Sequence, residues 1–271
     1  MRMSLRNPRR SLVLTAILLA LSVPAFAQSA ADSTAAPAAT EAVPAQVVSA
    51  EAQAILDRMT AYLRGLQSFS IDATATRDEV VSYGYKLQHN EHSTLIVNRP
   101  RQLRAEVTGD IRDRTFVYDG SNLVIYSPDD SVYTRTPATG NLNDLIGGLL
   151  DAGVELPLID VLYQAGAGTL TEAVRGGVLV GESDIEGVPC YQLAFRQANA
   201  DFQIWIEKGD RPLPRKVVIT TRYEVGDPQY SAVMTWNVQP KLDKSTFSFT
   251  APKGVTEIPF ADAAAVQERS K

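Results

Sequence analysis

The stretch 201–221 constrains the fold of this 271-residue chain more than any other, because it predicts two long strands joined by a turn. Its first half places Phe202, Ile204 and Ile206 at every second position between mostly polar neighbours, which is the alternation of a half-buried strand. Gly209 and the aspartate after it supply the reversal, and two prolines then keep the returning segment extended at a sheet margin. The stretch therefore predicts a hairpin of an antiparallel sheet.

Short alternating segments separated by turn sequences recur along most of the chain. Neighbouring short strands with tight turns are typical of a meander in which each strand pairs with the one before it. We expect an α+β fold in which one antiparallel sheet of about ten or eleven strands curls over. Further predicted strands include residues 69–75, 83–97, 103–107, 115–118, 123–126, 132–136, 177–180, 191–195, 230–236 and 247–249.

Two regions carry helical spacing instead. Ser49 can cap a first helix, whose apolar residues recur at three- and four-residue steps up to Leu66. A second region, 142–163, is rich in leucine and lies between two runs of strands. Its first helix contains Gly147 and Gly148, each of which costs about 1 kcal/mol relative to alanine.

The glycines leave two readings of the 142–163 region open. A weakly stabilised apolar helix pair moves more easily than a sheet and behaves as a lid. Alternatively, the pair belongs to the core and the glycines permit close packing. The expected lid residues are Leu142, Leu145, Ile146, Leu149, Leu156, Leu158, Ile159 and Leu162.

The N-terminus predicts export. Four arginines precede an apolar run that ends before Ala27, so we expect a cleavable signal peptide at 1–27, a flexible leader at 28–48, a folded domain at 49–260 and a loose tail at 261–271. With no cysteine near the cleavage site, the mature protein is expected in the periplasm without a lipid anchor or a membrane span. Cleavage lowers Lys+Arg from 26 to 22 and makes the formal net charge −9 (22 − 31), which disfavours nucleic acid as a partner.

Catalytic and metal-binding patterns are sparse in this sequence. His89 and His92 have a metal-like spacing, but residues three apart in a strand face opposite sides. The single cysteine, Cys190, lies in a strand-like stretch with no base nearby, which predicts a buried, inert thiol. We therefore expect no metal, no cofactor and no enzymatic activity.

Five motifs together carry a resemblance to a known family. They are Met59-x-x-Tyr-Leu63, residues 99–104 (RPRQLR), residues 116–128 (FVYDG leading to IYSP), residues 156–160 (LPLID), and residues 202–206 (FQIWI) through 212–216 (PLPRK). The chain resembles the LolA/LolB/LppX superfamily of bacterial lipoprotein-handling and lipid-binding proteins over about 50–258. It is most similar to a branch of predicted periplasmic proteins of unknown function.

The resemblance implies a half-open β-barrel whose apolar concave side is covered by helices, with acyl chains held between. The expected wall residues are Leu103, Phe116, Tyr118, Ile204, Trp205 and Val217. We therefore expect a non-catalytic carrier for a lipid or lipoprotein acyl chain, with an envelope membrane protein as a further candidate partner. A regulatory module that binds a protein partner, a structural interaction domain with a collapsed cavity and a lipid ester hydrolase remain as alternatives.

Overall fold

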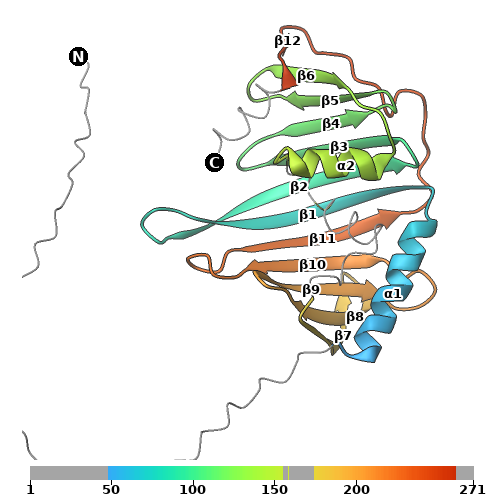
Figure 1. Ribbon diagram of the computed structural model, residues 1–271, viewed down its shortest axis with the longest axis vertical. Helices are drawn as coiled ribbons and strands as arrows, with labels where there is room; N and C mark the ends of the chain where they lie inside the picture. Colours follow the sequence, from blue (N-terminus) through green and yellow to red (C-terminus); the bar gives the residue numbers. More distant parts are fainter. Residues whose placement is uncertain (1–47, 155–157, 159–173, 261–271) are drawn as a thin grey trace, which may run out of the picture. The chain divides into compact units, whose positions relative to one another are not determined.

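The computed structural model describes residues 48–154, 158 and 174–260. The expected signal peptide, most of the leader and the C-terminal tail lie outside the described residues, as does the predicted second helix of the 142–163 region. Two helices and twelve strands are described (Figure 1), with bounds α1 (Ala50–Gly65), β1 (Ser68–Val80), β2 (Lys86–Asn98), β3 (Gln102–Gly109), β4 (Arg114–Tyr118), β5 (Asn122–Ser127), β6 (Val132–Pro137), α2 (Leu142–Asp151), β7 (Gly176–Ile185), β8 (Val188–Arg196), β9 (Ala200–Glu207), β10 (Pro214–Thr221), β11 (Gln229–Asn237) and β12 (Thr256–Glu257).

All twelve strands belong to one sheet, in the order β12-β6-β5-β4-β3-β2-β1-β11-β10-β9-β8-β7. Every pairing is antiparallel except that of β12 with β6. The sheet curls without closing, since β12 and β7 are its two edges (Figure 1). The expected α+β class with one large curled antiparallel sheet is confirmed.

The expected strand at 247–249 is wrong. Asp243 accepts hydrogen bonds from the backbone N–H groups of Ser245 and Thr246, at 2.7 and 2.9 Å, and so holds the chain in a turn. Phe247 is buried from this turn, and the ring of Phe249 packs against two tyrosines of β5 and β6. The last strand is instead β12, which forms nine residues later than predicted.

Helix α1 begins where the sequence predicts. The Ser49 hydroxyl accepts a hydrogen bond from Ala52 N at 3.2 Å, and Ser49 N donates to Gly177 O at 2.9 Å, which fixes the helix start to edge strand β7. The buried face of α1 packs on β8 and β9 in one hydrophobic cluster, which contains Ala52, Ile55, Leu56, Met59, Leu63, Leu193, Phe195, Phe202, Ile204, Ile206 and Leu213.

Helix α2 packs on a different part of the same face of the sheet. Its buried residues share a cluster with Phe116 of β4 and Val217 of β10, and Val217 lies directly opposite Ile204, which packs under α1. Residues directly opposite one another in a sheet point to the same side. Both helices therefore cover one face, which we call the covered face (Figure 1).

Candidate functional site

The centre of the covered face is lined by small side chains. Ala73 of β1 lies opposite Ser93 of β2, and Ala75 of β1 lies opposite Ala232 of β11. Each of the four is at most 5 % exposed. We call these four residues the small-residue strip. Because these four side chains are short, they themselves fill little space above the centre of the sheet.

Helix α2 directs a leucine-rich face onto this part of the sheet. Leu142, Ile146 and Leu149 are buried, Leu145 is partly buried, and Leu158 after the helix is 6 % exposed. All five belong to or pack against the cluster that contains the three alanines of the small-residue strip. The other expected lid residues, Leu156, Ile159 and Leu162, lie outside the described residues.

The N-terminal end of α2 is attached to the sheet. Asn141 and Asp144 form a reciprocal capping box that satisfies the first N–H groups. The Tyr118 hydroxyl donates to Gly140 O at 2.9 Å, and Leu142 N donates to Pro100 O at 2.9 Å. The helix is thus held at its start by polar contacts, while its remaining length rests on apolar contacts alone among the interactions of its described residues.

One glycine of α2 bears on the close-packing interpretation of this region. A Cβ added at Gly148 would meet no atom within 4 Å. Gly148 is therefore not required for close packing, and the close-packing interpretation is wrong for this residue. The effect of Gly148 on α2 is therefore the loss of helix stability that glycine causes.

Four of the expected wall residues share one hydrophobic cluster with the buried residues of α2. Leu103, Phe116, Tyr118 and Val217 are all in the cluster of the small-residue strip.

The other two wall residues are placed differently. Ile204 is on the covered face but packs under α1. Trp205 faces the opposite side of the sheet, where the Lys216 ammonium lies 5.0 Å from its ring centroid. Consecutive strand residues point to opposite faces, so Trp205 cannot share a wall with Ile204, which corrects the expected site.

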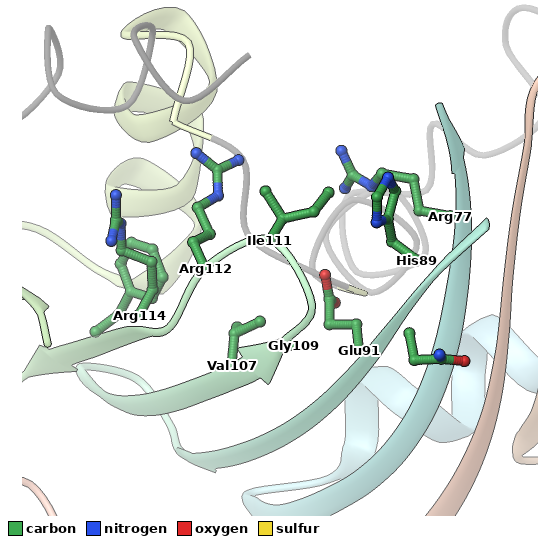
Figure 2. A pocket seen from close by; sticks show the side chains of 10 residues that line it. Arg77, His89, Glu91, Val107, Gly109, Ile111, Arg112 and Arg114 are labelled. Carbon is green, nitrogen blue, oxygen red and sulfur yellow. The ribbon is translucent and has the colours of Figure 1, made fainter. Parts of the chain in front are cut away.

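A charged pocket borders the small-residue strip, and sequence reasoning missed it. Arg77 of β1, Arg112 of the β3–β4 loop and Arg114 of β4 line a space of about 60 Å³ together with His89 and Glu91 (Figure 2). A signal was present, because Arg77 continues the alternation that places Ala73 and Ala75 on the covered face. The β3–β4 loop could not be placed beside it without the register of the strands.

Burial and a neighbouring charge act on the pocket's arginines. Arg114 is 8 % exposed, and burial followed by the adjacent Arg112 lowers the pKa of its guanidinium, while Asp130 at 3.8 Å opposes this shift. The His89 imidazole pairs with Glu79 at 2.8 Å. The pocket therefore combines two neighbouring arginines, Arg112 and Arg114, with aspartates that act on Arg114 in the opposite sense.

Known catalytic arrangements do not form among the candidate groups. His89 lies on the covered face, whereas His92 lies on the opposite face and pairs with Asp72 at 3.4 Å. The Ser93 hydroxyl donates to Glu91 at 3.2 Å. Burial raises the pKa of the Cys190 thiol to about 11. Within the described ranges, no group of three or more His, Cys, Asp or Glu residues could hold a metal ion, and no helix is long and apolar enough to cross a bilayer.

Comparison with solved structures finds distant similarity. An uncharacterised conserved protein from Thermus thermophilus is 14 % identical, with a TM-score of 0.45 over 77 % of this chain and 99 % of that chain. The Mycobacterium tuberculosis lipoprotein LppX is 14 % identical, with a TM-score of 0.44 over 71 % and 98 %. A LolA superfamily protein from Nitrosomonas europaea is 12 % identical, with a TM-score of 0.34 over 73 % and 97 %.

Comparison with curated proteins and with family models gives two further results. No curated protein matches the chain. Residues 52–261 match the model of one family, described as "Predicted periplasmic protein (DUF2092)", which confirms the resemblance to such a branch. The chain belongs to the DUF2092 family of predicted periplasmic proteins.

Proposed function

We propose that this protein is a periplasmic, non-catalytic carrier that holds the acyl chain of a lipid or lipoprotein between α2 and the small-residue strip. The observation that carries the proposal is the pairing of a leucine-rich helix face with a sheet centre of alanine and serine side chains. An ordinary core fills such a centre with large side chains from both layers. Here the volume next to the sheet is available to a guest once α2 moves outward.

The energy available to such a guest is large. Each buried CH₂ group contributes about 0.8 kcal/mol, so a long acyl chain gains on the order of 10 kcal/mol before ordering costs. Uptake must displace the contacts of Leu142, Ile146 and Leu149 with the sheet. Since polar contacts hold the start of α2, we propose that the helix pivots about Gly140 and Asn141 while its C-terminal end lifts.

The proposal also assigns a role to each segment of the chain. Residues 1–27 direct export and are removed, residues 28–48 form a leader, and residues 49–260 form the carrier domain. Loading and unloading then occur in the periplasm. No cofactor or metal takes part.

A larger side chain in the small-residue strip tests the proposal. We expect the mature chain to bind a fluorescent fatty acid saturably, and Ala75→Leu to weaken that binding about tenfold because leucine occupies the guest's space. The control is Ala194→Leu, which lies on the opposite face of β8 and should bind as the wild type does. Overpacking costs about 1–3 kcal/mol, so urea unfolding is measured for both variants. Unchanged binding by a folded Ala75→Leu protein would contradict the proposal.

A protein-binding module is the second candidate, and a surface feature favours it. Tyr83 and Tyr85 at the β1–β2 turn are 88 % and 70 % exposed, and Tyr223 and Val225 at the β10–β11 turn are 78 % and 79 % exposed. The two turns are adjacent, since a Cβ at Gly226 would lie 3.3 Å from the Val80 side chain. Clustered exposed tyrosines are typical of protein interfaces.

The second candidate has its own test. A photo-reactive amino acid at position 83 should cross-link one envelope membrane protein in living cells, while the same amino acid at exposed position 244 should not. Cross-links to lipid alone, or equal cross-linking at both positions, would rule this candidate out.

A further inference from the structure

Among the described residues, Arg99 is a partly buried cation without a counterion. Its Nε is buried and has no hydrogen-bond partner, and its side chain forms no ion pair within the part of the chain that the structure describes. Burial lowers the pKa of the guanidinium, and no carboxylate of the described residues opposes this shift. Buried polar atoms without a partner are rare in folded proteins, so Arg99 calls for an explanation.

Arg99 lies where the two helices approach one end of the sheet. It follows the last residue of β2, and its backbone N–H donates to Gln67 O at 2.8 Å, just past the C-terminal end of α1. The carbonyl of the next residue, Pro100, accepts from the N–H of Leu142, the first residue of α2, at 2.9 Å. Figure 1 shows the end of α1 and the start of α2 at this end of the sheet. Backbone contacts thus link the turn that carries Arg99 to both helices of the covered face.

A row of covered-face residues on β2 leads from Arg99 to the small-residue strip. Val97, Leu95 and Ser93 are buried on that face at every second position, and Arg99 takes the next position of the row, just past the strand end. Six residues at about 3.3 Å each place Arg99 about 20 Å from Ser93 along the strand. One acyl chain covers about 15 Å, which is half of the hydrocarbon core of a bilayer. A head group held at Arg99 therefore leaves the end of its acyl chain close to the small-residue strip.

Two other arginines of this chain show what the Nε edge of a guanidinium binds. Arg196 directs Nε and Nη2 at the two carboxylate oxygens of Asp201, both at 2.8 Å. Arg215 directs the same two nitrogens at one oxygen of Glu207, at 3.0 and 2.6 Å. This edge fits the planar pair of oxygens of a carboxylate, and it fits phosphate equally well. In Arg99 the Nε of the same edge has no acceptor.

The first turn of α2 does not neutralise Arg99. The Asp144 carboxylate accepts a hydrogen bond from Asn141 N at 3.0 Å. The Asn141 side chain in turn accepts from the N–H groups of Asn143 and Asp144. Because the capping box engages these groups with one another, the binding of an anion at this place would depend on Arg99.

We propose that Arg99 binds the carboxylate or phosphate of an amphiphile whose acyl chain runs along the covered face toward the small-residue strip. This inference rests on the proposed carrier function and specifies its ligand as anionic. The free protein leaves the buried Nε without a partner, which is unfavourable, and a bound oxyanion supplies the missing acceptor. Since Arg99 is next to the fixed start of α2, the head group binds at the end of the helix that stays in place while the other end lifts.

The test compares three ligands that share one alkyl chain length. Dodecanoate and dodecyl phosphate carry an oxyanion at pH 8, and dodecanol does not. The binding of each to the full mature chain is measured by titration calorimetry below its critical micelle or solubility limit. The variants are Arg99→Gln and Arg99→Met, two uncharged replacements, so that one remains if the other does not fold. The control is Arg101→Gln, which removes an exposed arginine from the same turn.

We expect the wild type to bind at least one of the anionic ligands at least about tenfold more tightly than dodecanol, since charge-assisted hydrogen bonds are stronger than neutral ones. Both Arg99 variants should lose this preference and bind dodecanol within about twofold of the wild type, whereas Arg101→Gln should keep the preference. Equal affinity of the wild type for all three ligands, or an unchanged preference in folded Arg99 variants, would overturn the head-group site while leaving the carrier function intact.

Urea unfolding of the free protein provides a second readout. Removing a partly buried charge that has no counterion leaves no partner behind, so Arg99→Met should keep or raise the urea midpoint. A clearly lower midpoint would show that the chain itself supplies a partner to Arg99, and this would overturn the assigned role.

Three further outcomes separate the sources of failure. Binding of none of the three ligands to the wild type would overturn the carrier function and the head-group site together. Acetate or inorganic phosphate that binds as tightly as the amphiphile with the same oxyanion would show a site for a free anion and overturn the amphiphile. A preference lost equally in Arg101→Gln would show that the charge of the whole turn attracts the ligand, which also overturns the role assigned to Arg99.

Discussion

At the scale of single residues, Cys190 illustrates a prediction that the structure explains physically. Its side chain is fully buried, its Sγ lies 3.3 Å from Val188 O, and burial raises the pKa of the thiol to about 11. We expect almost no reaction with a thiol-specific disulfide reagent at pH 8 in the native protein, and full reaction in urea. Rapid labelling of the native protein, measured by absorbance, would contradict this placement.

The Arg196–Asp201 pair makes stability depend on pH. Two hydrogen bonds of 2.8 Å from Arg196 lower the pKa of the Asp201 carboxyl. Because the pKa of Asp201 is lower in the folded state than in the unfolded state, the pair stabilises the fold at pH values above the unfolded-state pKa. This contribution is lost as the pH falls through the folded-state pKa. Asp201→Asn should therefore lower the urea midpoint at pH 7 by a small amount that shrinks in acid. A difference that stays constant down to pH 2 would contradict the cause.

At the residue scale, an interaction could be predicted from the sequence when its two partners are close together in the chain. The Ser49 cap was predictable because its partner, Ala52, lies three residues away in the sequence. The face of Trp205 was not decided, since Trp205 is apolar and interrupts the alternation of its strand. The arginine pocket was missed because Arg77 and Arg112 are 35 positions apart in the sequence.

At the scale of elements, the two helices differ in what holds them. Helix α1 has 16 residues, with its one glycine at the last position, whereas α2 has 10 residues and two internal glycines. Glycine in a helix interior costs about 1 kcal/mol, so α2 should open locally at a lower free energy than α1. Hydrogen exchange should therefore be faster in α2. Equal protection of the two helices would contradict the role of α2 as a movable cover.

Substituting Gly148 turns this difference into a direct test. A Cβ at this position meets no atom within 4 Å, so Gly148→Ala should stabilise α2 by about 1 kcal/mol and slow its hydrogen exchange about fivefold. If α2 must move for uptake, association of a fluorescent fatty acid should slow as well. The matched control is Gly65→Ala at the end of α1, where the space is also open. Slower exchange with unchanged uptake would show that α2 does not gate the site.

The positions of the strands could be predicted from the sequence better than the contacts of the helices. Alternation and turn residues located the meander from β1 to β6 because each strand there pairs with its sequence neighbour. The expected strand at 247–249 failed because Asp243 closes a turn through its side chain, and alternation does not record such contacts. Which strands lie under α2 also depends on packing that no local pattern specifies.

At the scale of the whole molecule, one long-range pairing creates the site. Strand β1 pairs with β11 although the two are more than 140 residues apart, and this pairing joins the two halves of the sheet. It brings Ala75 beside Ala232 and so completes the small-residue strip. No sequence pattern predicts that partner, so the small-residue strip could not be found from the sequence.

The central claim is that an acyl chain lies between α2 and the small-residue strip. The most direct test is photo-cross-linking of the full mature protein with a palmitic acid that carries a diazirine at its terminal carbon, followed by peptide mass spectrometry. The account predicts cross-links on Leu142–Asp151 and on residues 69–75 of β1, because both segments border the space assigned to the acyl chain. Cross-links confined to the exposed turns or to the opposite face of the sheet would contradict it.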